Sequence, residues 1–212
     1  MVKKILFYFS TNVSDYLLAL QEHIGISLLA LLVAMVIGIP FGVLCTRSSR
    51  WYGWVTTIFN TFRIVPSLAI LILMIPVVGT GIKPTIIALI FLAIPPILIN
   101  TATGFHSLPF FMIEAAAGMG MTKSQIFFQV KIPLAMPLIM TGIRTATMEI
   151  IASATLAAYI GGGGLGMIIF TGLGLNRPDL LLIGGVSVAL LSILASMSLS
   201  FLEQKILKYR SI

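Results

Sequence analysis

The chain has 212 residues, of which 58% are hydrophobic and only 9% are charged, and its formal net charge is +7. A water-soluble core of ordinary size cannot hide that much apolar surface, so the composition excludes a soluble protein and predicts an integral membrane protein. The positive charges are spread over the ends of the apolar runs, where they can meet anionic lipid, and they form no basic stripe for nucleic acid.

Five apolar runs predict an all-α fold with five transmembrane helices. They approach or exceed the roughly 20 residues that cross about 30 Å of hydrocarbon as a helix. They also lack the alternation of polar and apolar residues that an outer-membrane barrel requires. The second run is short, so we expect its helix to begin near Tyr52. In chain order the runs are 24–44, 64–78, 82–103, 138–160 and 180–202.

The rest of the chain is short, and we expect one transmembrane domain over residues 1–212. Residues 1–23 hold two apolar patches split by polar residues, too broken for a signal peptide and better suited to a helix on the membrane surface. The longest polar segments are 106–136 and the glycine-rich 161–179. Lys and Arg are in excess on one side if 106–136 is cytoplasmic, which places the N-terminus outside and the C-terminus inside.

The 106–136 loop contains two predicted short helices, 109–120 and 122–131, with a bend at its glycines. Thr122 followed by Gln125 has the pattern of a capping box. In the second helix Ile126, Phe127 and Val130 share one face at helical spacing. Such a helix either rests on lipid headgroups or fits a groove of a partner protein, and these residues alone leave both interpretations open.

Motifs for catalysis and cofactor binding lack the context they need. Gly161, Gly163 and Gly166 match the spacing of a dinucleotide loop, but no predicted strand precedes them. We therefore expect a tight turn in which positive φ angles are tolerated. The two histidines, His23 and His106, stand apart from each other and from the cysteine, which predicts no metal site. We expect no enzymatic activity and no cofactor bound by this chain.

Charged residues inside predicted spans are costly and need a reason. Arg63 and Glu149 fall at about 17 and 18 Å from the cytoplasmic side, counted at about 1.5 Å per residue. One hypothesis pairs them across the second and fourth spans, beside Pro66 and Ser67, as part of a translocation path. The alternative is two separately solvated side chains. Arg144 lies nearer the surface and can extend to it.

The 106–136 loop also carries a family resemblance. Its motif is Glu-Ala-Ala, three residues, Gly, nine residues, and then an aliphatic residue, any residue, an aliphatic residue and Pro. This motif resembles the loop of bacterial type I, binding-protein-dependent ABC importer permeases. In that family the loop is a cytoplasmic coupling helix that binds the ATPase subunit. The resemblance and the loop's helical pattern together imply docking by Glu114, Ala115, Ala116, Gly120, Thr122, Ile126, Val130 and Pro133. Glu114 either meets a basic partner or caps its own helix.

Further segments resemble the branch that imports glycine betaine, carnitine and choline. They are FRIVPSLA at 62–69, GIRTA at 142–146 and IGGGGLG at 160–166. The resemblance implies a permease in the bacterial cell membrane that works with a second permease, identical or paralogous, and an extracytoplasmic substrate-binding protein. ATP and Mg²⁺ would bind to two partner ATPase subunits. It also places the glycine loop near the external gate. The alternatives are a permease for methionine or another amino acid and, from another class, a self-sufficient gated channel.

Overall fold

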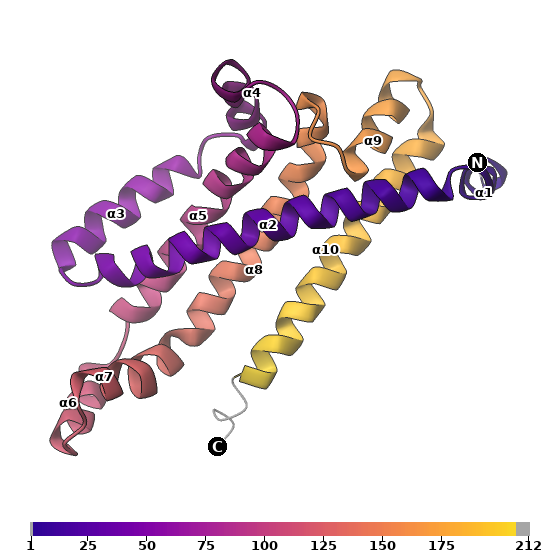
Figure 1. Ribbon diagram of the computed structural model, residues 1–212. Helices are drawn as coiled ribbons and strands as arrows, with labels where there is room; N and C mark the ends of the chain where they lie inside the picture. The colour runs from indigo at the N-terminus through magenta and orange to yellow at the C-terminus, as the bar shows by residue number, and fades with distance from the viewer. Residues whose placement is uncertain (1, 207–212) are drawn as a thin grey trace. The chain divides into compact units, whose positions relative to one another are not determined.

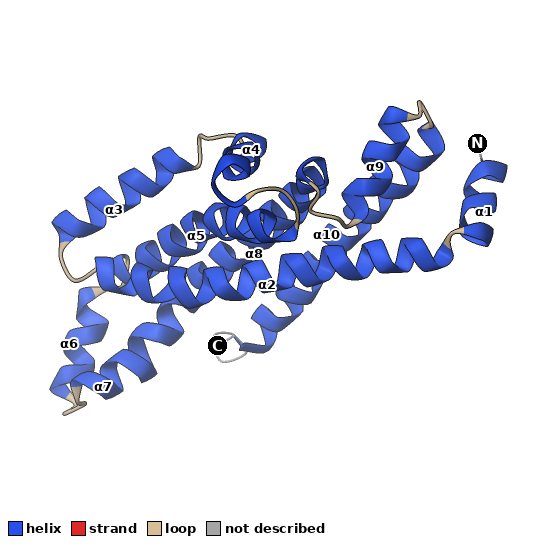
Figure 2. Cartoon of the chain, turned by 45° about the horizontal axis from the view of Figure 1, so that its top comes forward, coloured by secondary structure: helices blue, strands red, loops and turns tan. Residues whose placement is uncertain are grey.

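A computed structural model describes residues 2–206, which form helices joined by short turns, with no strand among them (Figure 1, Figure 2). This confirms the predicted all-α membrane fold. The helices are α1 Val2–Thr11, α2 Val13–Cys45, α3 Ser49–Phe62, α4 Ser67–Val78, α5 Ile82–His106, α6 Phe110–Gly118, α7 Lys123–Gln125, the π-helix η1 Ile126–Lys131, α8 Ile132–Ala157, the 3-10 helix η2 Ala158–Ile160, α9 Leu165–Gly174 and α10 Pro178–Ile206.

Four helical stretches of residues 2–206 are long and apolar enough to cross a membrane, and α3 with α4 makes a fifth if both belong to one span. The predicted continuous second helix is wrong, because the chain leaves the helical conformation between Phe62 and Ser67. Pro66 explains the break. Its ring disfavours helical geometry at Val65 and it has no N–H to donate to the preceding turn.

Two helices begin earlier in the chain than the apolar runs that predicted them. Residues 13–23 do not belong to a separate surface helix with α1, but form the first turns of α2, where Asp15 favours the positive end of the helix dipole. The helix that contains the fourth predicted span likewise begins before its apolar run. Helix runs without a break from Lys123 to Ala157, and its π-helical residues change the hydrogen-bond register just before Pro133, whose nitrogen cannot donate.

The chain divides into two compact units. Unit 1 comprises Met1–Val33, Val65–Ala93 and Thr147–Ser196, and unit 2 comprises Ala34–Ile64, Ile94–Ala146 and Met197–Ile212. In unit 1, one apolar cluster forms around Leu71 and Ile160, and another forms around Leu165 and Leu180.

Unit 2 packs α2 closely against α5. A Cβ added at Gly42 would lie 2.7 Å from Cβ of Thr101 and 2.8 Å from the carbonyl oxygen of Leu98. A side chain at this position would therefore separate the two helices, which explains why a residue without one stands there.

Candidate functional site

The 106–136 loop of unit 2 folds as a helical hairpin, α6 followed by α7 and η1, beyond the ends of α5 and α8 (Figure 1). Gly120 makes the bend between them with φ +82°. The predicted capping box is confirmed. The Gln125 backbone N–H donates to Oγ1 of Thr122 at 3.3 Å, and the Thr122 backbone N–H donates to Oε1 of Gln125 at 2.8 Å.

The predicted docking residues of this loop differ in accessibility. Ala116 and Ile126 are buried, and their helices α6 and η1 contact each other. Phe127 stacks on Phe105 of α5, with 5.8 Å between ring centroids. The face that includes Ile126 and Phe127 therefore holds the hairpin together and is turned toward its own chain. Glu114, Ala115, Gly120, Thr122 and Pro133 are exposed, and Val130 is half-buried.

The loop also exposes large apolar side chains that are not among the predicted docking residues. Their exposed fractions are 75% for Phe110, 66% for Phe111, 75% for Met119 and 63% for Phe128. The adjacent aromatic residues just before Glu-Ala-Ala were the available signal for an exposed apolar surface. The helical spacing of one apolar face could not show which aromatic side chains pack inward. Aromatic residues and methionine are enriched at the centres of protein interfaces.

The glycine segment 161–166 of unit 1 needs glycine for two reasons, a positive φ angle at some positions and close helix packing at another. Gly161 and Gly163 have φ values of +83° and +75°, as predicted, and Gly164 has +74°. Gly166 is a different case, because its φ is not positive and an added Cβ would lie 2.1 Å from the carbonyl oxygen of Thr155. It marks close helix packing, which the spacing of glycines alone could not reveal.

The glycine-rich segment 161–179 contains a short helix that its composition did not predict, α9 at Leu165–Gly174. After α9, Arg177 donates to the carboxylate of Asp179 at 2.5 Å. This hydrogen bond raises the pKa of the Arg177 guanidinium, since it stabilises the charged form.

The predicted path residues lie in different parts of the chain. Arg63 is exposed at the end of α3, while Pro66 and Ser67 start α4. Glu149 is half-buried on α8 and takes part in an interaction of its own. Arg63 belongs to unit 2 and the other three to unit 1, so the pairing of Arg63 with Glu149 stays a prediction.

Arg144 has an unexpected partner, Glu203 near the end of α10, with which it forms an ion pair in unit 2. The side chains of Arg144 and Glu203 are 36% and 21% exposed. The position of Arg144 in the sequence predicts a side chain that extends to the surface, and no local pattern indicates this carboxylate 59 residues away.

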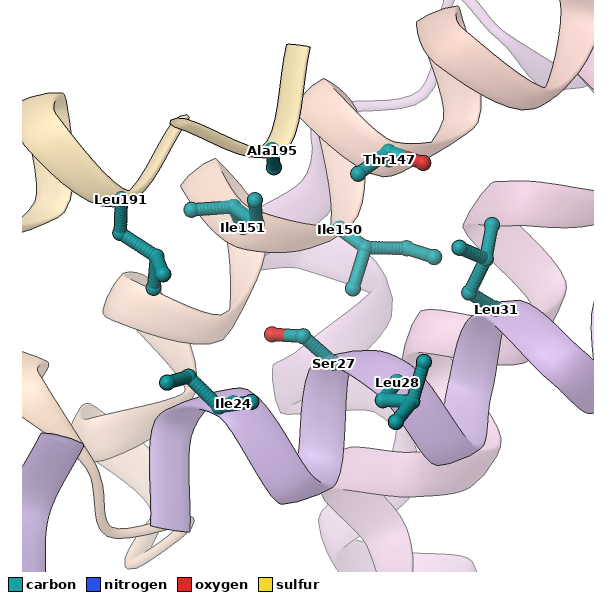
Figure 3. A pocket seen from close by; sticks show the side chains of 9 residues that line it. All are labelled: Ile24, Ser27, Leu28, Leu31, Thr147, Ile150, Ile151, Leu191 and Ala195. Atoms are coloured by element: carbon teal, nitrogen blue, oxygen red, sulfur yellow. The ribbon is translucent and has the colours of Figure 1, made fainter. Parts of the chain in front are cut away.

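Unit 1 contains an apolar cavity of about 130 Å³ between α2, α8 and α10. The hydroxyl of Ser27 points into the space enclosed by the lining side chains (Figure 3) and has no hydrogen-bond partner within residues 2–206. The lining residues are Ile24, Ser27, Leu28, Leu31, Thr147, Ile150, Ile151, Leu191 and Ala195. No group of three or more metal-ligating side chains occurs in the part of the chain that the structure describes.

Comparison with known proteins identifies the family. Residues 38–208 match the family described as binding-protein-dependent transport system inner membrane component. The chain belongs to this family. It is therefore a multi-pass membrane component of a transport system, in agreement with its apolar helices.

Similar permeases occur in Bacillus subtilis and Listeria monocytogenes. The chain is 42% identical over 199 residues to the choline transport system permease protein OpuBB of Bacillus subtilis, covering 94% of this chain and 92% of the relative. It is 40% identical over 205 residues to the glycine betaine/carnitine/choline permease OpuCB of the same organism, covering 97% and 94%. The carnitine transport permease OpuCB of Listeria monocytogenes is 42% identical over 202 residues, covering 95% and 93%.

Solved structures support the fold of this permease. An inward-facing structure of the MetNI methionine ABC transporter has a TM-score of 0.75 at 24% identity, covering 93% of this chain and 96% of that chain. An amino acid ABC transporter with histidines has the same TM-score at 17% identity, covering 94% and 97%. At these identities the likeness concerns the fold, which is that of type I ABC importer permeases.

Proposed function

We propose that this chain is the permease subunit of an ATP-driven importer for quaternary-amine osmoprotectants such as glycine betaine, carnitine and choline. The supporting observation is the similarity, at 40–42% identity and over more than nine tenths of both chains, to permeases named for these substrates. In this proposal two permeases, identical or paralogous, form the path, and an extracytoplasmic binding protein delivers the substrate.

The hairpin of α6, α7 and η1 binds the ATPase subunit, which carries the ATP and Mg²⁺. Its geometry supports this role, because a rigid bend and a capping box hold a short helix whose neighbours expose Phe110, Phe111 and Phe128. An aromatic side chain that enters a groove of a partner removes a large apolar area from contact with water, which favours association. Docking there places the loop in the cytoplasm, with the N-terminus outside and the C-terminus inside.

Transport requires both ends of the permease to respond to ATP. When ATP draws the two ATPase subunits together, these subunits move the two docking hairpins. The transmembrane helices of the two permeases then change between inward-open and outward-open states. The Gly161–Gly166 turn belongs to the external gate, and Arg63, Pro66, Ser67 and Glu149 belong to the path. The chain supplies binding and movement, while the bond-breaking chemistry takes place on the partner.

Reconstitution in proteoliposomes tests this function. The permease with its ATPase and binding protein should take up radiolabelled betaine, carnitine or choline only when ATP is present on the side of the membrane that carries the ATPase subunits. Methionine and proline serve as competing substrates, and an ATPase variant that cannot hydrolyse ATP serves as the control. Uptake of methionine alone would favour the amino-acid permease, and solute flux without any ATPase subunit would favour the self-sufficient channel.

A further inference from the structure

Two consecutive residues of α2 in unit 1, Glu22 and His23, contact the glycine turn across 142 positions of sequence. Oε2 of Glu22 accepts a hydrogen bond from the backbone N–H of Gly164 at 3.0 Å. A Cβ added at Gly163 would lie 2.6 Å from the same oxygen. The turn therefore rests directly on the Glu22 carboxylate, at a place where only glycine leaves room for it.

His23 fixes the same part of α2 to α8. Its side chain is buried, with 1% of its surface exposed, and its Nε2 lies 3.2 Å from the carbonyl oxygen of Ile151. A carbonyl oxygen only accepts, so Nε2 carries the proton and donates it. The other ring nitrogen, Nδ1, has no hydrogen-bond partner among residues 2–206 and faces Gly164, where an added Cβ would lie 3.0 Å away.

The opposite side of the turn is held by the start of α5. The backbone N–H of Gly81 donates to the carbonyl oxygen of Ile160 at 2.8 Å. A Cβ at Gly162 would lie only 2.4 Å from Oγ1 of Thr85. The turn thus lies between α2 and α5 and continues directly from α8, and it contacts all three without intervening side chains of its own.

Packing between α2 and α8 becomes looser one helical turn further along. Ser27 and Ile151 line the 130 Å³ cavity, and the Ser27 hydroxyl has no partner in the described part of the chain. Side chains beside a cavity lose few contacts when the helices shift, because they have few contacts across it. The interface is therefore fixed by polar contacts at Glu22 and His23 and is deformable beyond them.

We propose that Glu22 and His23 are positioning residues of the external gate, which tie the Gly161–Gly164 turn to α2 so that a shift of α2 against α8 moves the turn. This inference rests on the proposed function, which assigns the turn to the gate. Glu22 acts as a hydrogen-bond acceptor for a backbone N–H, and its negative charge is not required to bind substrate.

Substitutions at Glu22 separate these roles. Glu22→Gln keeps an acceptor oxygen without the charge, whereas Glu22→Ala and Glu22→Met remove the acceptor, and Met keeps the side-chain length. In proteoliposomes with the ATPase and binding protein, we expect Glu22→Gln to keep the maximal uptake rate within about twofold. Loss of the acceptor should lower that rate about tenfold, as expected when a backbone N–H is left without its hydrogen bond, without changing the half-saturating substrate concentration.

The control is Gln21→Ala, an exposed neighbour on α2, which should leave uptake unchanged. Movement of the turn is followed at Tyr159, which is 65% exposed, by replacing it with cysteine after Cys45→Ser has removed the single native cysteine. Labelling of this cysteine by an impermeant maleimide should change when ATP is added to the complex. The Glu22→Met variant should lose that change while its ATPase subunit still hydrolyses ATP.

Equal defects in Glu22→Gln and Glu22→Met would show that charge matters, and would overturn the inference. Unchanged uptake and unchanged labelling in Glu22→Met would overturn it too, while leaving the importer intact. Failure of the unsubstituted complex to take up any osmoprotectant would instead end the proposed function. Poor recovery of Glu22→Ala and Glu22→Met with normal Glu22→Gln, and ATP-dependent labelling preserved in the recovered fraction, would show a role in folding alone and also refute the inference.

Discussion

Two glycines of this permease, Gly120 and Gly166, are required for different physical reasons. Gly120 in the docking hairpin has φ +82° and open space around it, because no described atom lies within 4 Å of an added Cβ. Gly166 follows the Gly161–Gly164 turn and has an ordinary φ, yet an added Cβ would meet the Thr155 carbonyl oxygen at 2.1 Å. One site needs a backbone conformation and the other needs space, so they should tolerate different replacements.

The strongest test of this difference is Gly166→Ala. The clash involves backbone atoms, which cannot rotate away, so either α9 or the end of α8 must shift. We expect about 3 kcal/mol of destabilisation, the upper part of the usual range for overpacking, measured as a lower unfolding temperature of the purified permease in detergent. Asn at this position should be at least as harmful.

Gly185→Ala is the matched control for that substitution. Gly185 lies within α10, and no described atom comes within 4 Å of its added Cβ. Alanine there should leave stability unchanged or raise it slightly, because alanine favours helix more than glycine does. If both variants unfold at the same temperature as the parent protein, space at Gly166 is not what requires glycine.

Docking is expected to respond to the exposed aromatics more than to the buried residues of the hairpin. Phe111→Asp should weaken binding of the ATPase subunit at least tenfold, since burying a carboxylate costs more than the phenyl ring contributes. Its unfolding temperature should stay within a few degrees of the parent value, because Phe111 is 66% exposed. Binding is measured by co-purification at graded ATPase concentrations.

Gln129→Asp provides the comparison for Phe111→Asp. Gln129 is exposed on η1 and polar already, so an added charge should reduce ATPase binding less than twofold. Equal losses for the two variants would mean that overall charge of the hairpin, and not its aromatic side chains, governs docking.

Gly120 should show the reverse pattern to Gly166. Alanine in a left-handed conformation costs about 1 to 2 kcal/mol, whereas asparagine adopts it more readily. We expect Gly120→Ala to weaken ATPase binding several-fold and Gly120→Asn to recover part of that loss. Overall unfolding should change little, because the strain is confined to an exposed bend. A matching loss for Ala and Asn would point to a steric role at this position as well.

The sequence predicted those features that depend on local or periodic patterns. Apolar runs gave the spans, and Thr122 with Gln125 gave the capping box. Features that depend on partners far apart in sequence stayed hidden, such as the Glu22–Gly164 hydrogen bond and the Arg144–Glu203 ion pair. The predicted second helix did not include the break at Pro66, because hydropathy counts apolar residues and contains no information on the backbone geometry that proline imposes. The inward position of Phe127 likewise required knowledge of what α5 presents to it.

Thr122 should have the smallest measurable effect, and it separates local order from surface chemistry in the docking hairpin. Thr122→Ala removes Oγ1, which accepts the Gln125 N–H, and should cost about 1 kcal/mol of helix stability at the start of α7. Thr122→Ser keeps that oxygen and should behave like the parent protein. Because helix is continuous from α7 into α8, a loosened cap frays only the first turn, and hydrogen exchange should rise at residues 123–126 but not beyond. ATPase binding should fall about twofold in Thr122→Ala, since the partner must then order the turn that the cap had already fixed. An equal fall in Thr122→Ser would mean that the threonine methyl group contacts the partner. In that case Thr122 would not support docking by ordering the hairpin.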